Sequence, residues 1–217
     1  MYSTVLFDFD GTLVSSLSLW TRAYQHALRE FGFDIALDEV KRTCFYRHFA
    51  DICESYGIAD SEGFRRQMNI GLHEAFVDAT LFPEARECLL LCRSLGLKTG
   101  LVTSSEEHLV TPALQKFALT ALFDTVVTGC QVANCKPHPE PVERALTSLN
   151  SAASSTLFVG DYEVDIVAGR AAGVTTALFF PEEHTLYYSF DLLHRTNPHL
   201  IFRDYSGIIE HLRDAVS

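Results

Sequence analysis

The chain has 217 residues, of which 47% are hydrophobic, so it is long enough to bury a full core in one domain or in two small ones. Its 28 acidic residues outnumber its 17 basic residues and give a formal net charge of -11. This balance argues against nucleic acid as a partner, because binding to phosphates requires clustered Lys and Arg.

The first predicted element is a short strand that ends in two carboxylates. The segment from Val5 to Val14 reads VLFDFDGTLV, so a strand at Thr4–Phe7 leads into Asp8 and Asp10. Alternate strand residues point to the same side, and the two like charges are therefore expected to lie close together. Such a pair is costly unless a cation or a shared proton relieves it, and a divalent metal with oxygen ligands is the simplest relief. The alternative is a strand-end turn without a metal.

A long helical segment follows this strand. About 90 residues separate the first strand from the second, whereas a βαβ unit needs only about 30. We therefore predict an inserted, all-helical domain over residues 16–81. Three amphipathic stripes indicate its helices, over Leu17–Phe31, Phe49–Tyr56 and Phe64–Phe76. Stripes of this kind are ordinary helix-packing surfaces.

The remaining residues, 82–217, alternate strands with helices and join residues 1–15 in one domain. The apolar runs predict strands at Thr99–Thr103, Thr125–Thr128, Thr156–Gly160 and Thr176–Phe179. Helical patterns lie between them, at Pro83–Leu95, Ser105–Phe117, Pro139–Leu149 and Glu163–Ala172. This alternation is typical of an α/β fold with a Rossmann-like, doubly wound parallel sheet. Pro112 lies inside the second helix and predicts a kink there or a restart near Thr111.

Polar side chains suited to phosphoryl chemistry follow the predicted strands. They are Asp8, Thr103, Ser104, Lys136, Asp161 and Asp165. Strand ends of this kind meet at the carboxyl edge of the sheet, where open α/β folds bind ligands. A carboxylate can attack phosphorus, a second can move a proton, and hydroxyl and ammonium groups can bind a phosphoryl group. Taken singly, these residues also have ordinary alternatives: a helix cap at Thr103 or Asp161, a solvated Lys136, or a surface acid at Asp165.

Four motifs in order carry a family resemblance. DFDGT, VTSS, KPHPEP and GDYEVD, each at a strand end, make the chain similar to the haloacid dehalogenase superfamily. The helical insertion resembles the cap of its phosphoglycolate phosphatase and β-phosphoglucomutase branch. The resemblance implies a Mg²⁺-dependent hydrolase of small phosphomonoesters that works through an aspartyl-phosphate. An acid at the position of Asp10 is typical of phosphatases and phosphomutases, whereas dehalogenating members lack one.

The resemblance also implies catalytic roles. Asp8 would be the nucleophile and Asp10 the general acid and base. Lys136 would act in catalysis by neutralising charge on the nucleophile and on the phosphoryl group. Thr103, Ser104 and Lys136 would bind the transferring phosphoryl group through hydroxyl, backbone N–H and ammonium donors.

A magnesium site is implied in the same way. The carboxylate of Asp8, the backbone carbonyl of Asp10 and the side chain of Asp161 would hold Mg²⁺. Asp165 would lie behind these ligands and orient either Lys136 or a metal-bound water.

Three other functions remain open from the sequence. They are a sugar phosphomutase, an inorganic pyrophosphatase of this superfamily, and a non-catalytic protein that binds phosphorylated metabolites. Substrate choice would depend on the helical domain, in which Lys41–Phe49 carries a local surplus of positive charge. Arg42 or Arg47 is a candidate to bind the non-reacting end of an anionic substrate, and a solvated helix face is the equal alternative. A monomer or a homodimer is expected.

The six cysteines and the absence of long apolar runs indicate the compartment. No CxxC pair occurs, and Cys88 and Cys92, four residues apart, are expected to be buried free thiols rather than zinc ligands. No apolar run approaches the roughly 20 residues of a membrane span, and no signal peptide precedes the first strand. We therefore expect a cytoplasmic protein without a membrane partner.

Overall fold

The computed structural model describes residues 1–45, 47 and 49–216, and its contacts divide the chain into two compact units. The core unit comprises Met1–Ser15 together with the chain from Leu81 onward. The helical unit comprises Ser16–Thr80. Within the described residues, no helix combines the length and the apolar character needed to cross a membrane.

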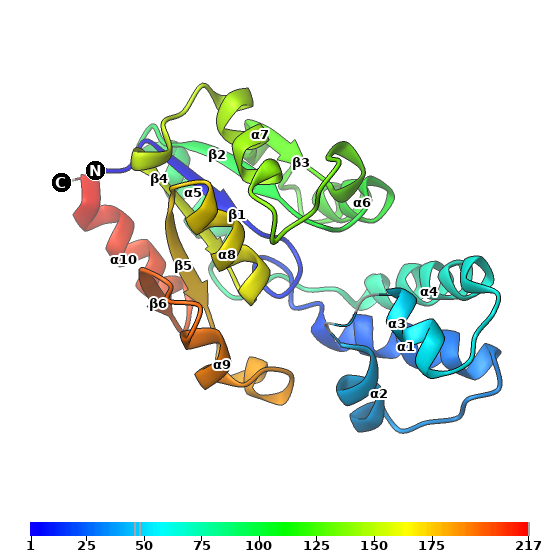
Figure 1. Ribbon diagram of the computed structural model, residues 1–217. Helices are drawn as coiled ribbons and strands as arrows, with labels where there is room; N and C mark the ends of the chain where they lie inside the picture. Colours follow the sequence, from blue (N-terminus) through cyan, green and yellow to red (C-terminus); the bar gives the residue numbers. More distant parts are fainter. Residues whose placement is uncertain (46, 48, 217) are drawn as a thin grey trace. The chain divides into compact units, whose positions relative to one another are not determined.

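A six-stranded sheet forms the centre of the core unit, with all neighbouring strands parallel and in the order β3-β2-β1-β4-β5-β6 (Figure 1). The strands are β1 Thr4–Phe7, β2 Lys98–Val102, β3 Thr125–Val127, β4 Thr156–Gly160, β5 Thr175–Phe179 and β6 Leu200–Phe202. The predicted doubly wound α/β fold is confirmed, with β1 fully buried at the centre. The last strand was not predicted, because it is only three residues long and half-buried.

Helices cover both faces of this sheet. They are α5 Ala85–Ser94, α6 Glu107–Lys116, α7 Glu140–Leu149, α8 Glu163–Ala171, α9 Phe190–His194 and α10 Tyr205–Val216. On one face, α7 and α8 bury Val142 and Ala168 against Leu6 of β1 and Phe158 of β4. The opposite face is covered by α5 and α10, which contact one another. The core therefore consists of two apolar layers that hold the central strands from both sides.

Glycines lie just past the ends of α5 and α8, since Gly96 and Gly173 have φ of 72° and 77°, in the left-handed region. After α5, the N–H of Leu97 bonds to the carbonyl of Cys92 at 2.9 Å, which closes the helix end. Of the two alternatives predicted at Pro112, the restart near Thr111 is wrong, because α6 runs on as one helix with Pro112 inside it, and the kink stays a prediction.

The chain leaves and re-enters the core unit at two adjacent points. Val14 forms an antiparallel bridge with Leu81. One residue on, the N–H of Phe82 donates to the carbonyl of Leu13 at 3.0 Å. Both connections are therefore fixed by backbone hydrogen bonds within the core unit.

The helical unit contains four α-helices among its described residues, α1 Leu17–Glu30, α2 Leu37–Cys44, α3 Phe49–Ser55 and α4 Ser61–Ala75. Three of them follow the predicted stripes, with Leu28, Ile52 and Phe64 fully buried. The helix α2 was not predicted, because it has eight residues and buries only Val40 and Cys44. The long helices α1 and α4 pack closely, since a Cβ on Gly71 would lie 3.0 Å from the Cα of Ala23.

Candidate active site

Asp8 lies at the centre of the carboxyl edge of the sheet. Phe7 pairs with Leu101 of β2 on one side and with Val159 of β4 on the other. Asp8 therefore emerges between the two strands that lead to Thr103 and Asp161. Its N–H donates to the carbonyl of Val159 at 2.9 Å, and its side chain is only 8% exposed.

A tight turn follows Asp8 and fixes the direction of the chain. The N–H groups of Leu13 and Val14 both donate to the carbonyl of Phe9 at 3.0 Å. Gly11 has φ of 75°, a conformation that costs glycine little and other residues more. The buried hydroxyl of Tyr205 on α10 donates to the carbonyl of Thr12 at 3.0 Å. The turn is thus held by its own backbone and by a distant helix.

Lys136 is buried beneath the carboxyl edge rather than solvated. Its side chain is 3% exposed, and its Nζ lies 2.5 Å from Oδ1 of Asp8 and 2.6 Å from Oδ1 of Asp165. The same Nζ donates to the carbonyl of Val102 at 3.0 Å. All three ammonium protons therefore have acceptors, and the lysine joins the ends of β1, β2 and α8.

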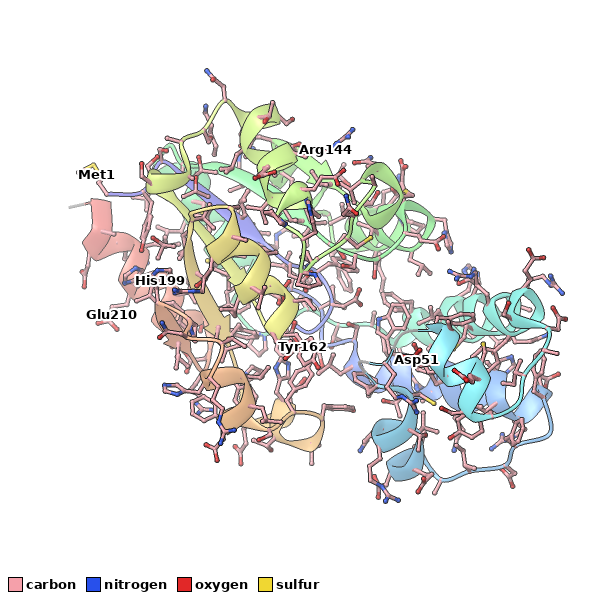
Figure 2. All side chains as sticks on the ribbon, viewed as in Figure 1. Met1, Asp51, Arg144, Tyr162, His199 and Glu210 are labelled. Atoms are coloured by element: carbon pink, nitrogen blue, oxygen red, sulfur yellow. The ribbon has the colours of Figure 1, made fainter. Side chains whose placement is uncertain are left out.

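Asp165 is buried as well and turns back toward the sheet. Its Oδ2 accepts a hydrogen bond from the N–H of Tyr162 at 3.1 Å, which caps the start of α8. Figure 2 shows Tyr162 at this end of the helix. A Cβ on Gly160 would lie 2.4 Å from the Cβ of Asp165, so only glycine leaves room for this approach. The alternative of a surface acid is wrong.

Asp161 faces Asp8 from the end of β4. The hydroxyl of Thr12 lies 3.4 Å from Oδ1 of Asp161 and 3.5 Å from Oδ2 of Asp8, and so lies between the two carboxylates. The hydroxyl of Tyr188 donates to Oδ2 of Asp161 at 2.5 Å. The sequence did not indicate Thr12 or Tyr188 as site residues.

The loop after β2 brings a further residue to Asp10. The hydroxyl of Ser105 donates to Oδ2 of Asp10 at 2.5 Å. Thr103 is buried, and its hydroxyl accepts from the N–H of Ser105 at 3.0 Å, so it shapes this loop. Ser104 is exposed, and its backbone lies close to Gly129. A Cβ on Gly129 would lie 2.3 Å from the carbonyl oxygen of Ser104. Sequence reasoning singled out Ser104 and missed Ser105, although the two hydroxyls are adjacent in VTSS.

One lysine faces three buried carboxylates, and the pKa values reflect this imbalance. Burial raises the pKa of Asp8 to about 7, against the opposing attraction of Lys136. Burial and the neighbouring Asp165 and Asp8 raise the pKa of Asp161 well above its usual range. Burial disfavours the charged form of Lys136, but Asp165 and Asp8 outweigh it and raise the pKa of that ammonium. The lysine is therefore charged, whereas burial favours the protonated forms of Asp8 and Asp161 unless a cation lies beside them.

This cluster fits a hard divalent cation. Asp8, Asp161 and Asp165 each offer a carboxylate oxygen, and these oxygens lie within 4.8 Å of one another. Because Asp165 already bonds Lys136 and the N–H of Tyr162, Asp8 and Asp161 are the carboxylates best suited to a metal. Carboxylate oxygens are the ligands that Mg²⁺ prefers, and a cation would favour the charged forms of Asp8 and Asp161. The ligand role of the Asp10 carbonyl stays a prediction.

The two arginines predicted for substrate binding make local contacts in the helical unit. Arg42 is exposed and pairs with Glu39, one helical turn away. Arg47 donates to the hydroxyl of Ser55 at 2.8 Å and to the carbonyl of Thr43 at 3.2 Å. The segment's Tyr46 and His48 lie outside the described residues. A role of Arg42 or Arg47 in binding substrate stays a prediction.

The thiols are placed largely as expected. Cys88 and Cys92 are buried on α5 as free cysteines. Cys44 and Cys53 are also buried, whereas Cys130 and Cys135 are exposed. No zinc ligand set of cysteines occurs among the described residues.

A doubly wound sheet with buried carboxylates and a buried lysine at its carboxyl edge is the architecture of an α/β enzyme. Residues 5–179 match the model of the haloacid dehalogenase-like hydrolases, and the chain belongs to that family. The family predicted from the four motifs is thereby confirmed.

Known proteins resemble the chain over most of its length. The pyrophosphatase PpaX of Oceanobacillus iheyensis is 32% identical over 177 residues, which cover 80% of this chain and 81% of that protein. A phosphoglycolate phosphatase from Haemophilus somnus, assigned by prediction, has a solved structure with a TM-score of 0.84 at 24% identity, covering 97% of this chain and 98% of its own. A family hydrolase from Deinococcus radiodurans, solved with bound phosphate and sodium, has a TM-score of 0.81 at 22% identity, covering 99% of this chain and 96% of its own. These structures share the fold of this chain.

Proposed function

We propose that the protein is a Mg²⁺-dependent phosphatase that hydrolyses a small phosphomonoester through an aspartyl-phosphate on Asp8. One observation carries the proposal: the buried Asp8 contacts Lys136 at 2.5 Å and lies with Asp161 and Asp165 in a cluster of carboxylates. A cluster of this kind destabilises the fold unless a ligand compensates for it, and perturbed groups of this sort gather at functional sites.

The proposed reaction uses two carboxylates in turn. A carboxylate oxygen of Asp8 bonds to phosphorus while the bond from phosphorus to the ester oxygen breaks. Asp10 gives its proton to the departing oxygen. Asp10 then takes a proton from water, whose oxygen bonds to phosphorus and releases Asp8 with inorganic phosphate. The hydrogen bond from Ser105 supports this role, because it holds the carboxyl of Asp10 in one orientation.

Lys136 and the loop after β2 would bind the phosphoryl group. The ammonium of Lys136 is already held beside the carboxylate of Asp8, so it can offset negative charge that develops there. Thr103 and Ser104 lie at the end of β2, on the same edge of the sheet, where donors for phosphoryl oxygens are needed. Mg²⁺, held by Asp8 and Asp161, would neutralise charge on the phosphoryl oxygens.

Pyrophosphate is the second candidate substrate. The observation that favours it is the relative named pyrophosphatase PpaX, which is 32% identical across four fifths of the chain. The same residues would carry both reactions, because only the leaving group differs: phosphate in place of an alcohol. A sugar phosphomutase would differ in the acceptor, since a sugar hydroxyl rather than water would take the phosphoryl group from Asp8.

A panel of phosphorylated compounds tests the proposal. The purified protein is incubated with p-nitrophenyl phosphate, phosphoglycolate, hexose phosphates and pyrophosphate, with Mg²⁺ or with EDTA, and free phosphate is measured. We expect Mg²⁺-dependent release of one phosphate per monoester. Two phosphates per pyrophosphate at a higher kcat/KM would instead assign the second candidate. Formation of a sugar phosphate isomer without free phosphate would assign the mutase.

Two variants give the controls. Asp8→Asn should abolish turnover of every substrate while the protein stays folded. Asp34→Asn makes the same chemical change at an exposed position of the helical unit, whose side chain is 85% exposed, and should leave turnover unchanged. Substantial turnover by Asp8→Asn would refute the aspartyl-phosphate.

A further inference from the structure

The two oxygens of Asp161 have different surroundings. Oδ1 faces the hydroxyl of Thr12, which also lies next to Asp8. Oδ2 accepts the hydroxyl of Tyr188 at 2.5 Å, a short bond typical of a hydroxyl donating to a carboxylate. One oxygen of Asp161 is therefore directed toward the carboxylate cluster, and the other is held by a residue from a different part of the chain.

Tyr188 is itself held in place from several sides. It lies 27 residues after Asp161, beyond β5, and only 8% of it is exposed. Its N–H donates to the carbonyl of His184 at 2.8 Å, which fixes the backbone. Its ring stacks on that of Tyr162 with a centroid distance of 5.1 Å and an interplanar angle of 24°. The hydroxyl thus reaches Asp161 from a ring that packing already orients.

His184, which lies beside Tyr188, does not hydrogen-bond to Asp161. His184 is fully buried among the rings of Phe82, Phe179, Phe180 and Tyr188. Its Nδ1 lies 4.0 Å from Oδ2 of Asp161, beyond hydrogen-bond distance, and neither ring nitrogen has a hydrogen-bond partner among the described residues. The imidazole packs against the tyrosine ring, and the phenol donates to Oδ2 of Asp161.

From this geometry we infer that Tyr188 is a positioning residue for the metal site, which holds Oδ2 of Asp161 so that Oδ1 is free to bind Mg²⁺. The inference rests on the proposed function, because it assumes that Asp161 is a metal ligand. Partners that orient a ligating carboxylate raise metal affinity, and their removal typically weakens it by about 10- to 100-fold. Through Tyr188, the segment after β5 would contribute indirectly to metal binding.

The test measures Mg²⁺ binding without substrate. Metal-free protein is titrated with Mg²⁺ in a calorimeter, for the wild type and for Tyr188→Phe, which removes one oxygen and keeps the ring. We expect the Kd for Mg²⁺ to rise about 10- to 100-fold. In turnover assays, the Mg²⁺ concentration for half-maximal rate should rise by a similar factor, while KM for the substrate at saturating Mg²⁺ stays within about twofold of the wild-type value.

Two control variants separate the possible results. Tyr2→Phe removes a hydroxyl that contacts His211 at the other end of the chain, and should leave the Kd for Mg²⁺ unchanged. Asp161→Asn should abolish binding. If the wild type binds Mg²⁺ and Tyr188→Phe binds it equally well, the inference is overturned while the proposed function stands. If the wild type binds no Mg²⁺, the proposed metal site fails, and the inference with it.

A second measurement, on the wild-type protein, tests the inference even if the Tyr188→Phe variant does not fold. The wild-type protein is labelled with ¹³C at tyrosine Cζ and titrated with Mg²⁺. A metal on Oδ1 withdraws charge from Oδ2, so the resonance of Tyr188 should shift and that of Tyr2 should stay in place. An unchanged Tyr188 resonance would overturn the inference.

Discussion

Removal of the charge on Asp8 should change how the stability of the metal-free protein depends on pH. Burial raises the pKa of Asp8 from 3.8 to about 7 in the folded state. Between these values Asp8 has lost its proton in the unfolded chain and kept it in the folded protein, so its contribution to stability is greatest below pH 3.8 and falls as pH rises toward 7. The interval is about 3 pH units, and at about 1.4 kcal/mol per unit the charged Asp8 costs the fold roughly 4 kcal/mol.

Asp8→Asn removes this titration, because an amide carries no proton that is lost in this range. Urea unfolding is followed in EDTA at about pH 5.5 and about pH 7.0, for the wild type and the variant. This window covers roughly half of the interval, so the wild type should lose about 2 kcal/mol more than the variant as pH rises. An equal pH dependence of the two proteins would refute the reasoning. Added Mg²⁺ should restore the stability of the wild type at the higher pH and have little effect on the variant.

Three further substitutions probe the surroundings of Asp8, Asp10 and Asp165. Lys136→Met leaves the buried carboxylates without a cation, and at neutral pH should lower the free energy of unfolding by about 3–5 kcal/mol in urea titrations. A loss below about 1 kcal/mol would contradict the buried ion pairs. Ser105→Ala removes the hydroxyl that donates to the carboxyl of Asp10 and should lower kcat about 10-fold with little change in KM. An unchanged kcat would exclude a positioning role for Ser105. Gly160→Ala places a methyl group against Asp165 at 2.4 Å. It should cost about 1–3 kcal/mol in thermal unfolding, and an unchanged Tm would show that Asp165 moves away freely.

The main site residues could be predicted from the sequence because strand register decides their place. Asp8 and Asp161 end buried apolar runs, and parallel strands carry such ends to one edge whatever the loops between them do. Lys136 could be predicted as a site residue from its position after the third strand and from the motif around it. Its burial and its bond to Asp165 could not be predicted, because they depend on the path of a loop and on the space above Gly160.

The residues that sequence reasoning missed have no local pattern. Ser105 is one of two adjacent serines, and only the three-dimensional turn decides which hydroxyl reaches Asp10. Tyr188 lies in an aromatic cluster whose composition indicates packing, which is also what most of its ring does. The elements β6 and α2 were missed for a related reason: β6 is only half-buried and α2 buries only two residues, so neither has a clear apolar pattern.

The bridge between Val14 and Leu81, with the bond from Phe82 to Leu13, has a consequence for how the family can vary. These bonds close the chain on itself just after the turn that follows Asp8, so the geometry of that turn does not depend on the length or sequence of the inserted segment. The entropy of closing an insertion grows only slowly with its length. A helical unit of another length can therefore replace this one at small entropic cost without changing the turn that follows Asp8.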